Sequence, residues 1–180
     1  MYSLSSLHTF GLDSHAQTLI GVDSILALKE ALNSVSNQPY YVLGEGSNSV
    51  FIENFLGVVI KVNLKGVGIE QTADDYLVKA GAGENWHQLV NTCLEQKMYG
   101  LENLALIPGT VGAAPIQNIG AYGVEVERFI EQVDYLDLQT NKLCSLSRQQ
   151  CQFDYRDSIF KHKLLGQAVI THVTFRLPKQ

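Results

Sequence analysis

The chain has 180 residues, of which 46% are hydrophobic and 17% charged, and its formal net charge is −5. This composition excludes a disordered chain, which would be poor in apolar residues and rich in charge. The negative balance argues against a nucleic-acid-binding protein, because such proteins need a basic face to displace the counterions of phosphates. The length predicts one domain or two small ones.

No segment indicates a membrane, a secretion signal or a metal site. Met1–Phe10 lacks the basic and long apolar regions of a signal peptide, and no stretch approaches the roughly 18 consecutive apolar residues of a membrane span. The three cysteines, Cys93, Cys144 and Cys151, are widely spaced, which favours reduced thiols over a disulfide framework. Neither these cysteines nor the five histidines show the spacing of metal ligands. We therefore expect a cytoplasmic protein without a metal.

In the first third of the chain, one helix and two strands are predicted. Asp23 stands where it would cap a helix, whose apolar face at helical spacing is formed by Ile25, Leu28, Leu32 and Val35. Tyr40–Leu43 is a short apolar run and predicts a buried strand, and Gly57–Val62 predicts another. Leu64–Asp75 shows little periodicity, so we place a subdomain boundary near residue 66.

Further along, Tyr76–Ala80 predicts a strand that ends at a glycine-rich turn. A helix is expected from about Glu84, with inward-facing Trp86, Leu89, Val90, Cys93 and Leu94. Two more strands are predicted near Ile130–Leu138 and Val169–Leu177. Short strands mixed irregularly with two or three helices indicate the α+β class, with subdomains at residues 1–66 and 67–180.

The first glycine loop is Gly44–Asn48. Glycine lets a ligand approach the backbone closely, and successive N–H groups form a concavity for anions. A tight turn between two strands explains the loop equally well. A dinucleotide fingerprint is excluded, because Ser49 stands where the third glycine is needed and Val50–Ile52 reads as strand rather than helix. The Gly-Lys-Ser/Thr ending of a P-loop is also absent from the sequence.

The second glycine loop is Ile107–Gly123, which carries four glycines, two prolines and almost no bulky side chains. Such a backbone is suited to lie against a flat, extended ligand, and Thr110, Gln117 and Asn118 supply hydrogen-bonding groups. The alternative is a packed crossing loop between subdomains. A purely structural loop of this length is uncommon, which favours a ligand.

These two loops and Tyr155–Lys161 occur in the same order in the UDP-N-acetylenolpyruvoylglucosamine reductases, and the sequence resembles that family over essentially all 180 residues. His8–Gly11, Gly81–Trp86 and Gly100–Leu104 also resemble it. The departures are mild: Ala113 and Ala114 replace residues that are usually Gly or Ser, and Ser49 replaces a usual aliphatic residue.

The resemblance implies a two-subdomain FAD-binding fold of the vanillyl-alcohol-oxidase type, with non-covalent FAD between the subdomains and its diphosphate on the glycine loops. In the implied reaction, NADPH reduces the flavin, which then passes a hydride to the enolpyruvyl group of a UDP-sugar. The product, UDP-N-acetylmuramate, is a precursor of bacterial cell-wall peptidoglycan. The cofactor-binding residues expected on this basis are Gly44, Gly46, Ser47, Asn48, Gly109, Thr110, Gly112, Gln117, Asn118, Gly120, Ala121, Tyr122 and Gly123.

Arg156 is the expected catalytic residue. Hydride addition builds negative charge toward the enolpyruvyl carboxylate, and a guanidinium offers a rigid fork of donors that matches a carboxylate. From the sequence alone, a surface salt bridge with Asp154 or Asp157 is the alternative. Tyr155 is expected to orient the substrate, with a core tyrosine as the alternative.

The family's third, C-terminal domain supplies a serine proton donor and a glutamate, which would lie beyond Gln180. We therefore expect this chain to bind FAD but to turn over slowly. Two other functions stay open: another oxidoreductase of the same fold with non-covalent FAD, since neither glycine loop contains the His or Cys of a covalent link, and a catalytically silent flavin-binding module.

Overall fold

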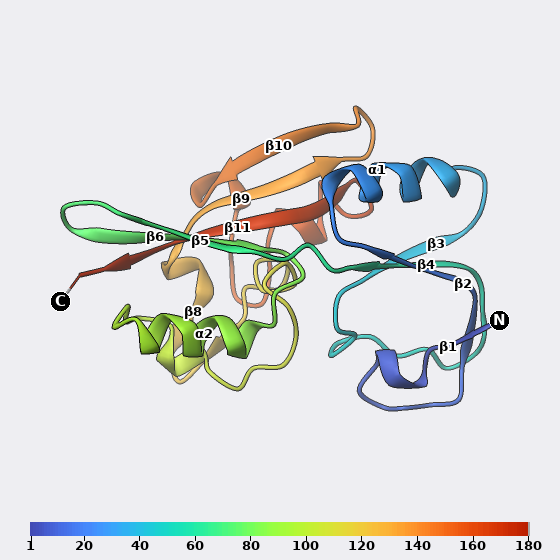
Figure 1. Cartoon of the computed structure of the whole chain (residues 1–180), viewed down its shortest axis with the longest axis horizontal. Helices are drawn as coiled ribbons and strands as arrows, with labels where there is room; N and C mark the ends of the chain where they lie inside the picture. The colour runs from blue at the N-terminus through green and yellow to red at the C-terminus, as the bar shows by residue number, and fades with distance from the viewer. Residues whose placement is uncertain (180) are drawn as a thin grey trace. The chain divides into compact units, whose positions relative to one another are not determined.

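The computed structural model describes residues 1–179. Its internal contacts divide the chain into two compact units, one formed by Met1–Leu64 and the other beginning at Lys65. The boundary expected from the sequence lies at residue 66. Each unit is built on its own β-sheet (Figure 1), and the units are described separately below.

The first unit is a four-stranded sheet in the order β1-β2-β4-β3 with one helix. The central strand β4 pairs in parallel with β2 on one side and β3 on the other, while β1 runs antiparallel to β2. Consecutive residues of a strand point to opposite faces of the sheet, and Val59 and Ile60 of β4 are both fully buried, so both faces of this strand are covered. The elements are β1 (Tyr2–Ser3), η1 (Ser5–Leu7), β2 (His15–Val22), α1 (Ile25–Ser34), β3 (Tyr40–Leu43) and β4 (Phe55–Val62).

Three expectations for this unit were wrong. The cap of α1 is Ser24 rather than Asp23, since the Ser24 hydroxyl accepts the N–H of Ala27 at 3.1 Å. Strand β3 has the predicted bounds, but it lies at the sheet edge, and Tyr40 and Tyr41 are exposed rather than buried. Val50–Ile52 belongs to no strand.

The second unit is a five-stranded antiparallel sheet in the order β10-β9-β11-β6-β5. One face packs against α2, where the rings of Trp86 and Phe175 meet edge to face with centroids 5.7 Å apart. The long strand β11 occupies the centre of the sheet (Figure 1). The strands and the helix are β5 (Val67–Gln71), β6 (Asp75–Gly81), α2 (Trp86–Glu95), β9 (Ile130–Asp137), β10 (Lys142–Ser147) and β11 (Ala168–Pro178).

The predicted strands at β6, β9 and β11 are confirmed, and so is the inward face of α2, of which only Leu94 is not fully buried. The helix begins two residues after Glu84, because the side chain of Asn85 caps it by accepting the N–H of Gln88 at 3.0 Å. Strands β5 and β10 were not predicted. Both lie at sheet edges and are largely exposed, so their sequences lack a buried apolar face.

Short elements complete the second unit. They are η2 (Glu102–Leu104), β7 (Gly120–Ala121), β8 (Val124–Glu125), η3 (Val126–Arg128), η4 (Gln149–Cys151) and η5 (Ile159–Lys161). Within residues 1–179, no helix has both the length and the apolar character required to cross a membrane. The same residues contain no group of three or more His, Cys, Asp or Glu side chains arranged to hold a metal ion.

Candidate functional site

The first glycine loop follows β3 and packs against the end of η1 and the residues just after it. Gly46 is buried with φ +74°, and a Cβ built on it would lie 1.7 Å from the carbonyl oxygen of Leu7. The hydroxyl of Thr9 donates to the carbonyl of Ser47 at 3.1 Å. The absence of a side chain at Gly46 is therefore required by the chain itself, whether or not a ligand is bound.

The second glycine loop is fixed at its start by the turn that precedes α2. The N–H of Trp86 donates to the carbonyl of Gly109 at 3.0 Å, and the N–H of Gly112 donates to the carbonyl of Ala82 at 2.9 Å. A Cβ on Gly112 would lie 2.6 Å from the Cβ of Ala82. Gly109, Thr110 and Gly112 are buried, so this half of the loop packs against its own unit.

Asn118 lies at the middle of the loop and is fully buried. Its amide nitrogen donates to the carboxylate of Glu125 and to the carbonyl of Asp154, both at 3.1 Å, and its oxygen accepts the N–H of Glu127, also at 3.1 Å. The three hydrogen bonds thus connect Asn118 to other parts of the chain and leave its amide occupied. The side chain therefore braces the loop against the segments that contain Glu125–Glu127 and Asp154.

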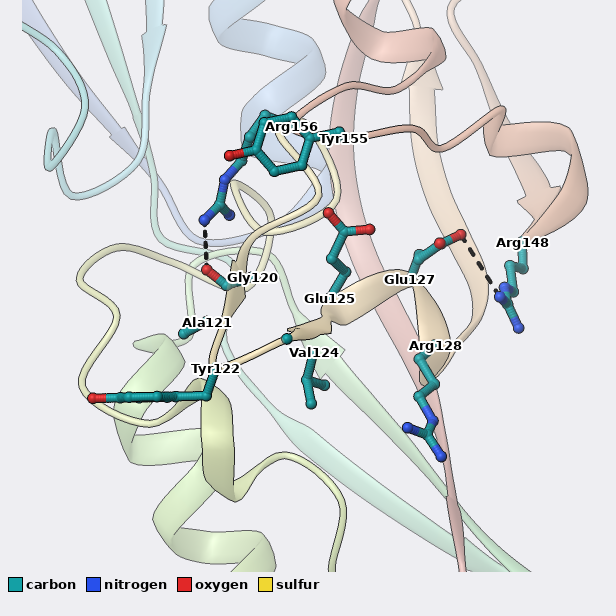
Figure 2. Close-up of a pocket in the computed structure, with 11 residues that line it drawn as sticks. Gly120, Ala121, Tyr122, Val124, Glu125, Glu127, Arg128, Arg148, Tyr155 and Arg156 are labelled. Carbon is teal, nitrogen blue, oxygen red and sulfur yellow. Dashed lines mark hydrogen bonds and ion pairs between the residues drawn. The ribbon is translucent and has the colours of Figure 1, made fainter.

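The last part of the loop borders a pocket of about 590 Å³ in the second unit. Figure 2 shows that Arg156 and Tyr155 lie near Gly120, whereas Arg128 and Arg148 lie on the far side beyond two glutamates. The lining residues are Gly120, Ala121, Tyr122, Gly123, Val124, Glu125, Glu127, Arg128, Arg148, Tyr155 and Arg156.

The pocket thus brings together six of the residues selected from the sequence, namely Gly120–Gly123, Tyr155 and Arg156. It does not include Gly109, Thr110, Gly112, Gln117 or Asn118. The first glycine loop belongs to the other unit. Whether the selected residues bind a cofactor stays a prediction.

Arg156 is held by backbone carbonyl groups of the second glycine loop. Its Nη2 donates to the carbonyl of Gly120 at 2.6 Å, and Nη1 lies 3.5 Å from the carbonyl of Asn118 (Figure 2). Its own carbonyl accepts from Nζ of Lys161 at 2.8 Å, and its backbone has φ +53°, which is uncommon for a residue other than glycine. The guanidinium therefore has a defined position at the pocket edge.

The expected alternative, a salt bridge from Arg156 to a neighbouring aspartate, does not form in the described chain. Asp154 accepts the N–H of Tyr155 at 2.7 Å. Asp157 pairs with His162 at 2.6 Å, and this hydrogen bond lowers the pKa of the Asp157 carboxyl. Arg156 is thus left without a carboxylate and able to receive one from a ligand.

Two tyrosine rings are open to solvent at the pocket. Tyr155 is 78% exposed, so it is not a core tyrosine, and Tyr122 is 89% exposed. The guanidinium carbon of Arg156 lies 5.8 Å from the centre of the Tyr155 ring, within the range of a cation–π contact.

The charged residues on the far side of the pocket were not among those predicted from the sequence. Arg148 lies 3.7 Å from Glu127, and Arg128 stacks over Phe129 with 5.9 Å between the guanidinium carbon and the ring centre. One signal in the sequence could have pointed to them: the charged residues of Glu125–Arg128 come directly after a loop with almost no charge.

Comparisons with known proteins agree with this architecture. Residues 16–146 match the family model described as FAD binding domain. The chain is 54% identical over 177 residues to UDP-N-acetylenolpyruvoylglucosamine reductase from Pseudoalteromonas atlantica, covering 98% of this chain and 51% of that protein. It spans about half the length of the curated relatives it matches.

Solved structures give the same result for the fold. The UDP-N-acetylenolpyruvylglucosamine reductase of Thermus caldophilus superposes with a TM-score of 0.77 at 26% identity, covering 99% of this chain and 61% of that one. The glucooligosaccharide oxidase of Acremonium strictum, at 11% identity, shares the fold with a TM-score of 0.63, covering 97% of this chain and 38% of that one. The expected α+β fold of the vanillyl-alcohol-oxidase type is confirmed. The chain therefore belongs to the FAD binding domain family and is homologous to the FAD-binding half of the UDP-N-acetylenolpyruvoylglucosamine reductases.

Proposed function

We propose that the chain binds FAD non-covalently and forms the FAD-binding part of an NADPH-dependent reductase that converts UDP-N-acetylglucosamine enolpyruvate to UDP-N-acetylmuramate. The observation that carries the proposal is the pocket in which Gly120–Gly123 and the Arg156 guanidinium lie together. A flat ligand and a carboxylate could be held there side by side. The similar curated proteins are named as UDP-N-acetylenolpyruvoylglucosamine reductases. The pocket has chemical groups suited to an enolpyruvyl substrate with a carboxylate.

The residues at the end of the second glycine loop fit a flat ring system. A Cβ on Gly123 would meet no atom within 4 Å, so the backbone there borders open space. The exposed ring of Tyr122 lies beside it and offers an aromatic face. FAD, when bound, supplies the hydride chemistry, since a flavin can accept a hydride and pass it on. Gly120–Gly123 would orient its ring.

In this proposal Arg156 binds the carboxylate of the enolpyruvyl group. The two parallel donors of a guanidinium match a carboxylate in a bidentate arrangement. Because Gly120 already holds one end of the guanidinium, little rearrangement is needed when charge develops, and preorganised donors of this kind stabilise transition states strongly. Tyr155 would orient the same substrate from the neighbouring position.

The remaining residues divide into ligand contacts and supports. Gly44, Ser47 and Asn48 of the first glycine loop would donate to the diphosphate of FAD through backbone and side chain. Gly46 and Asn118 would act as supports, because the first approaches Leu7 and the second has protein partners on every side. Gly109, Thr110, Gly112 and Gln117 would shape the loop and contact FAD through its backbone.

Two other functions are less well supported. The glucooligosaccharide oxidase of Acremonium strictum has a 6-S-cysteinyl, 8α-N1-histidyl FAD, whereas neither glycine loop of this chain contains cysteine or histidine. A flavin-binding module without chemistry would not need an arginine held free of carboxylates at the pocket. The use of NADPH and a cytoplasmic location remain predictions.

Flavin content tests the proposal. The purified chain, supplied with FAD, should show the visible absorbance of a flavoprotein and release unmodified FAD on acid treatment. Gly123→Trp should lower the flavin content, because its side chain enters the pocket, whereas Arg156→Ala should retain flavin. An apoprotein that binds no FAD under any condition would refute the proposal.

Turnover provides a second test. We propose that the half of the relatives' length that this chain does not span supplies the proton donor, and positioned general acid catalysis typically contributes about 10²–10⁴-fold. Formation of UDP-N-acetylmuramate by this chain should therefore be slower by at least that factor than by the complete Pseudoalteromonas atlantica reductase. Equal turnover numbers would show that the chemistry resides within these residues.

A further inference from the structure

Glu84 lies where the start of the second unit meets the turn before α2. Its carboxylate Oε1 accepts the N–H of Gly66 at 2.7 Å, and Oε2 lies 3.6 Å from Nζ of Lys65. Lys65 and Gly66 directly follow Leu64, where the first unit ends. The Glu84 side chain is 20% exposed, and a hydrogen bond to an ionised carboxylate is stronger than one between neutral groups.

Glu84, Gly66 and Gly81 form a closed ring of hydrogen bonds. The N–H of Gly66 donates to the Glu84 carboxylate, the N–H of Gly81 donates to the carbonyl of Gly66 at 2.9 Å, and the N–H of Glu84 donates to the carbonyl of Gly81 at 3.0 Å. In a closed ring each bond restrains the other two. The carboxylate is the one member of this ring that a side-chain substitution removes.

The backbone of Glu84 also carries the second glycine loop. Its carbonyl accepts the N–H of Val111 at 2.9 Å. The next residue, Asn85, pairs with Thr110 in an isolated β-bridge. The loop thus begins from the same short backbone segment that the carboxylate of Glu84 holds in place.

We propose that Glu84 is a positioning residue for the second glycine loop. Its carboxylate fixes the backbone to which Val111 is bound and so sets the shape that the loop presents to its ligand. The consequence for FAD rests on the function proposed above, whereas the consequence for the loop does not. A carboxylate that merely complements the dipole of α2 would affect the first turn of that helix and leave Val111 unchanged.

Amide hydrogen exchange and FAD affinity, measured on the whole chain, test this role. Glu84→Ala should speed exchange at Gly66 and Val111 by about tenfold or more and weaken FAD binding, followed by flavin fluorescence, by a similar factor. Glu84→Gln keeps an acceptor oxygen and should restore most of both. Glu102→Ala is the matched control, because the carboxylate of Glu102 accepts the N–H of Gly100 at 2.5 Å, outside the loop. It should leave Val111 exchange and FAD affinity unchanged.

Three results would overturn the proposal: Val111 exchange in Glu84→Ala equal to that of the unmodified chain, FAD affinity equal in the two, or failure of Glu84→Gln to recover any protection. Absence of FAD binding by the unmodified chain would instead refute the proposed function. Exchange at Val111 would then still decide whether Glu84 positions the loop, so the two failures are distinguishable.

Discussion

The two glycine loops have similar compositions, but their glycines face different neighbours. In the first loop, Gly46 turns with φ +74° against the carbonyl of Leu7, and no space remains for a side chain. In the second loop, Gly123 has almost the same φ of +75°, but it faces open space at the edge of the pocket. A glycine in such a loop can therefore be packed against the chain or border open space, and composition alone does not separate the two cases.

The same contrast divides the second loop internally. Its first half is bound to the turn before α2 and its middle is braced by Asn118, so these parts serve the protein's own packing. Only Gly120–Gly123 reaches the pocket. Only four of the 17 residues in this segment therefore line the pocket.

Alanine at Gly46 and at Gly123 should separate two costs of a side chain: the collision with neighbouring atoms, which only Gly46 has, and the positive φ, which both positions share. Both variants place a Cβ at φ near +75°, which costs about 1–2 kcal/mol. Gly46→Ala must also displace the Leu7 carbonyl, so we expect a total loss of about 3–5 kcal/mol in the free energy of unfolding. Urea denaturation followed by circular dichroism measures both. Equal losses in the two variants would remove the distinction between the loops.

Arg156→Lys tests whether the pocket at the end of the second loop serves the chemistry. Lysine retains the charge but loses the planar fork, so reoxidation of flavin by the enolpyruvyl substrate should slow by about 10²-fold, while its reduction by NADPH should be unchanged. The measurement is stopped-flow absorbance on this chain joined to the remaining half of the Pseudoalteromonas atlantica reductase. Slow reduction with normal reoxidation would assign Arg156 to the other half-reaction.

Asn118→Ala tests whether the middle of the second loop supports the fold. The substitution removes two donated bonds and one accepted bond of a buried amide, and we expect a loss of about 2 kcal/mol in the free energy of unfolding. Flavin affinity should fall along with stability. A variant that loses flavin while its thermal midpoint is unchanged would show that Asn118 contacts the ligand directly.

The smallest effect is expected from His172, in the central strand β11 of the second unit. Its pKa lies below the ordinary 6.5, first because burial disfavours the charged form and then because Lys79 repels it, although Asp134 acts in the opposite direction. The folded chain therefore binds this proton more weakly than the unfolded chain does. The free energy of unfolding should fall as pH drops from about 6.5 toward the folded-state pKa.

His172→Gln should flatten that pH dependence without changing stability near neutral pH. Thermal midpoints measured at intervals between about pH 5 and pH 7 give the comparison. If the unmodified chain gains stability relative to the variant on acidification, the pKa of His172 is raised rather than lowered.

Strongly patterned elements were predictable from the sequence. The bounds of β3 match, and the buried side chains of α2 follow its helical periodicity. The edge strands β5 and β10 were missed because each has one neighbour and little burial, so nothing constrains their side chains to alternate. The cap of α1 was misplaced by one residue because aspartate and serine are equally good caps, and only the geometry selects Ser24.

Six of the residues selected from the sequence line one pocket, but the contacts among them were not predictable. The sequence singled out Arg156 and offered two adjacent aspartates as partners. The actual partner is the carbonyl of Gly120, 36 residues away. Backbone acceptors exist at every position of a chain, so no residue type marks the one that will be used. A contact of this kind depends on the tertiary fold and has no signature in local sequence.

That contact also determines what a survey by mutation would find. Because Arg156 is held through carbonyl oxygens of Gly120 and Asn118, replacing side chains around the pocket one at a time leaves both acceptors in place. If Arg156 acts as proposed, an alanine scan would detect the arginine but would not reveal its partner. The partner would become visible only to a probe of the main chain itself, such as an ester in place of the amide that follows Gly120, which weakens its carbonyl as an acceptor.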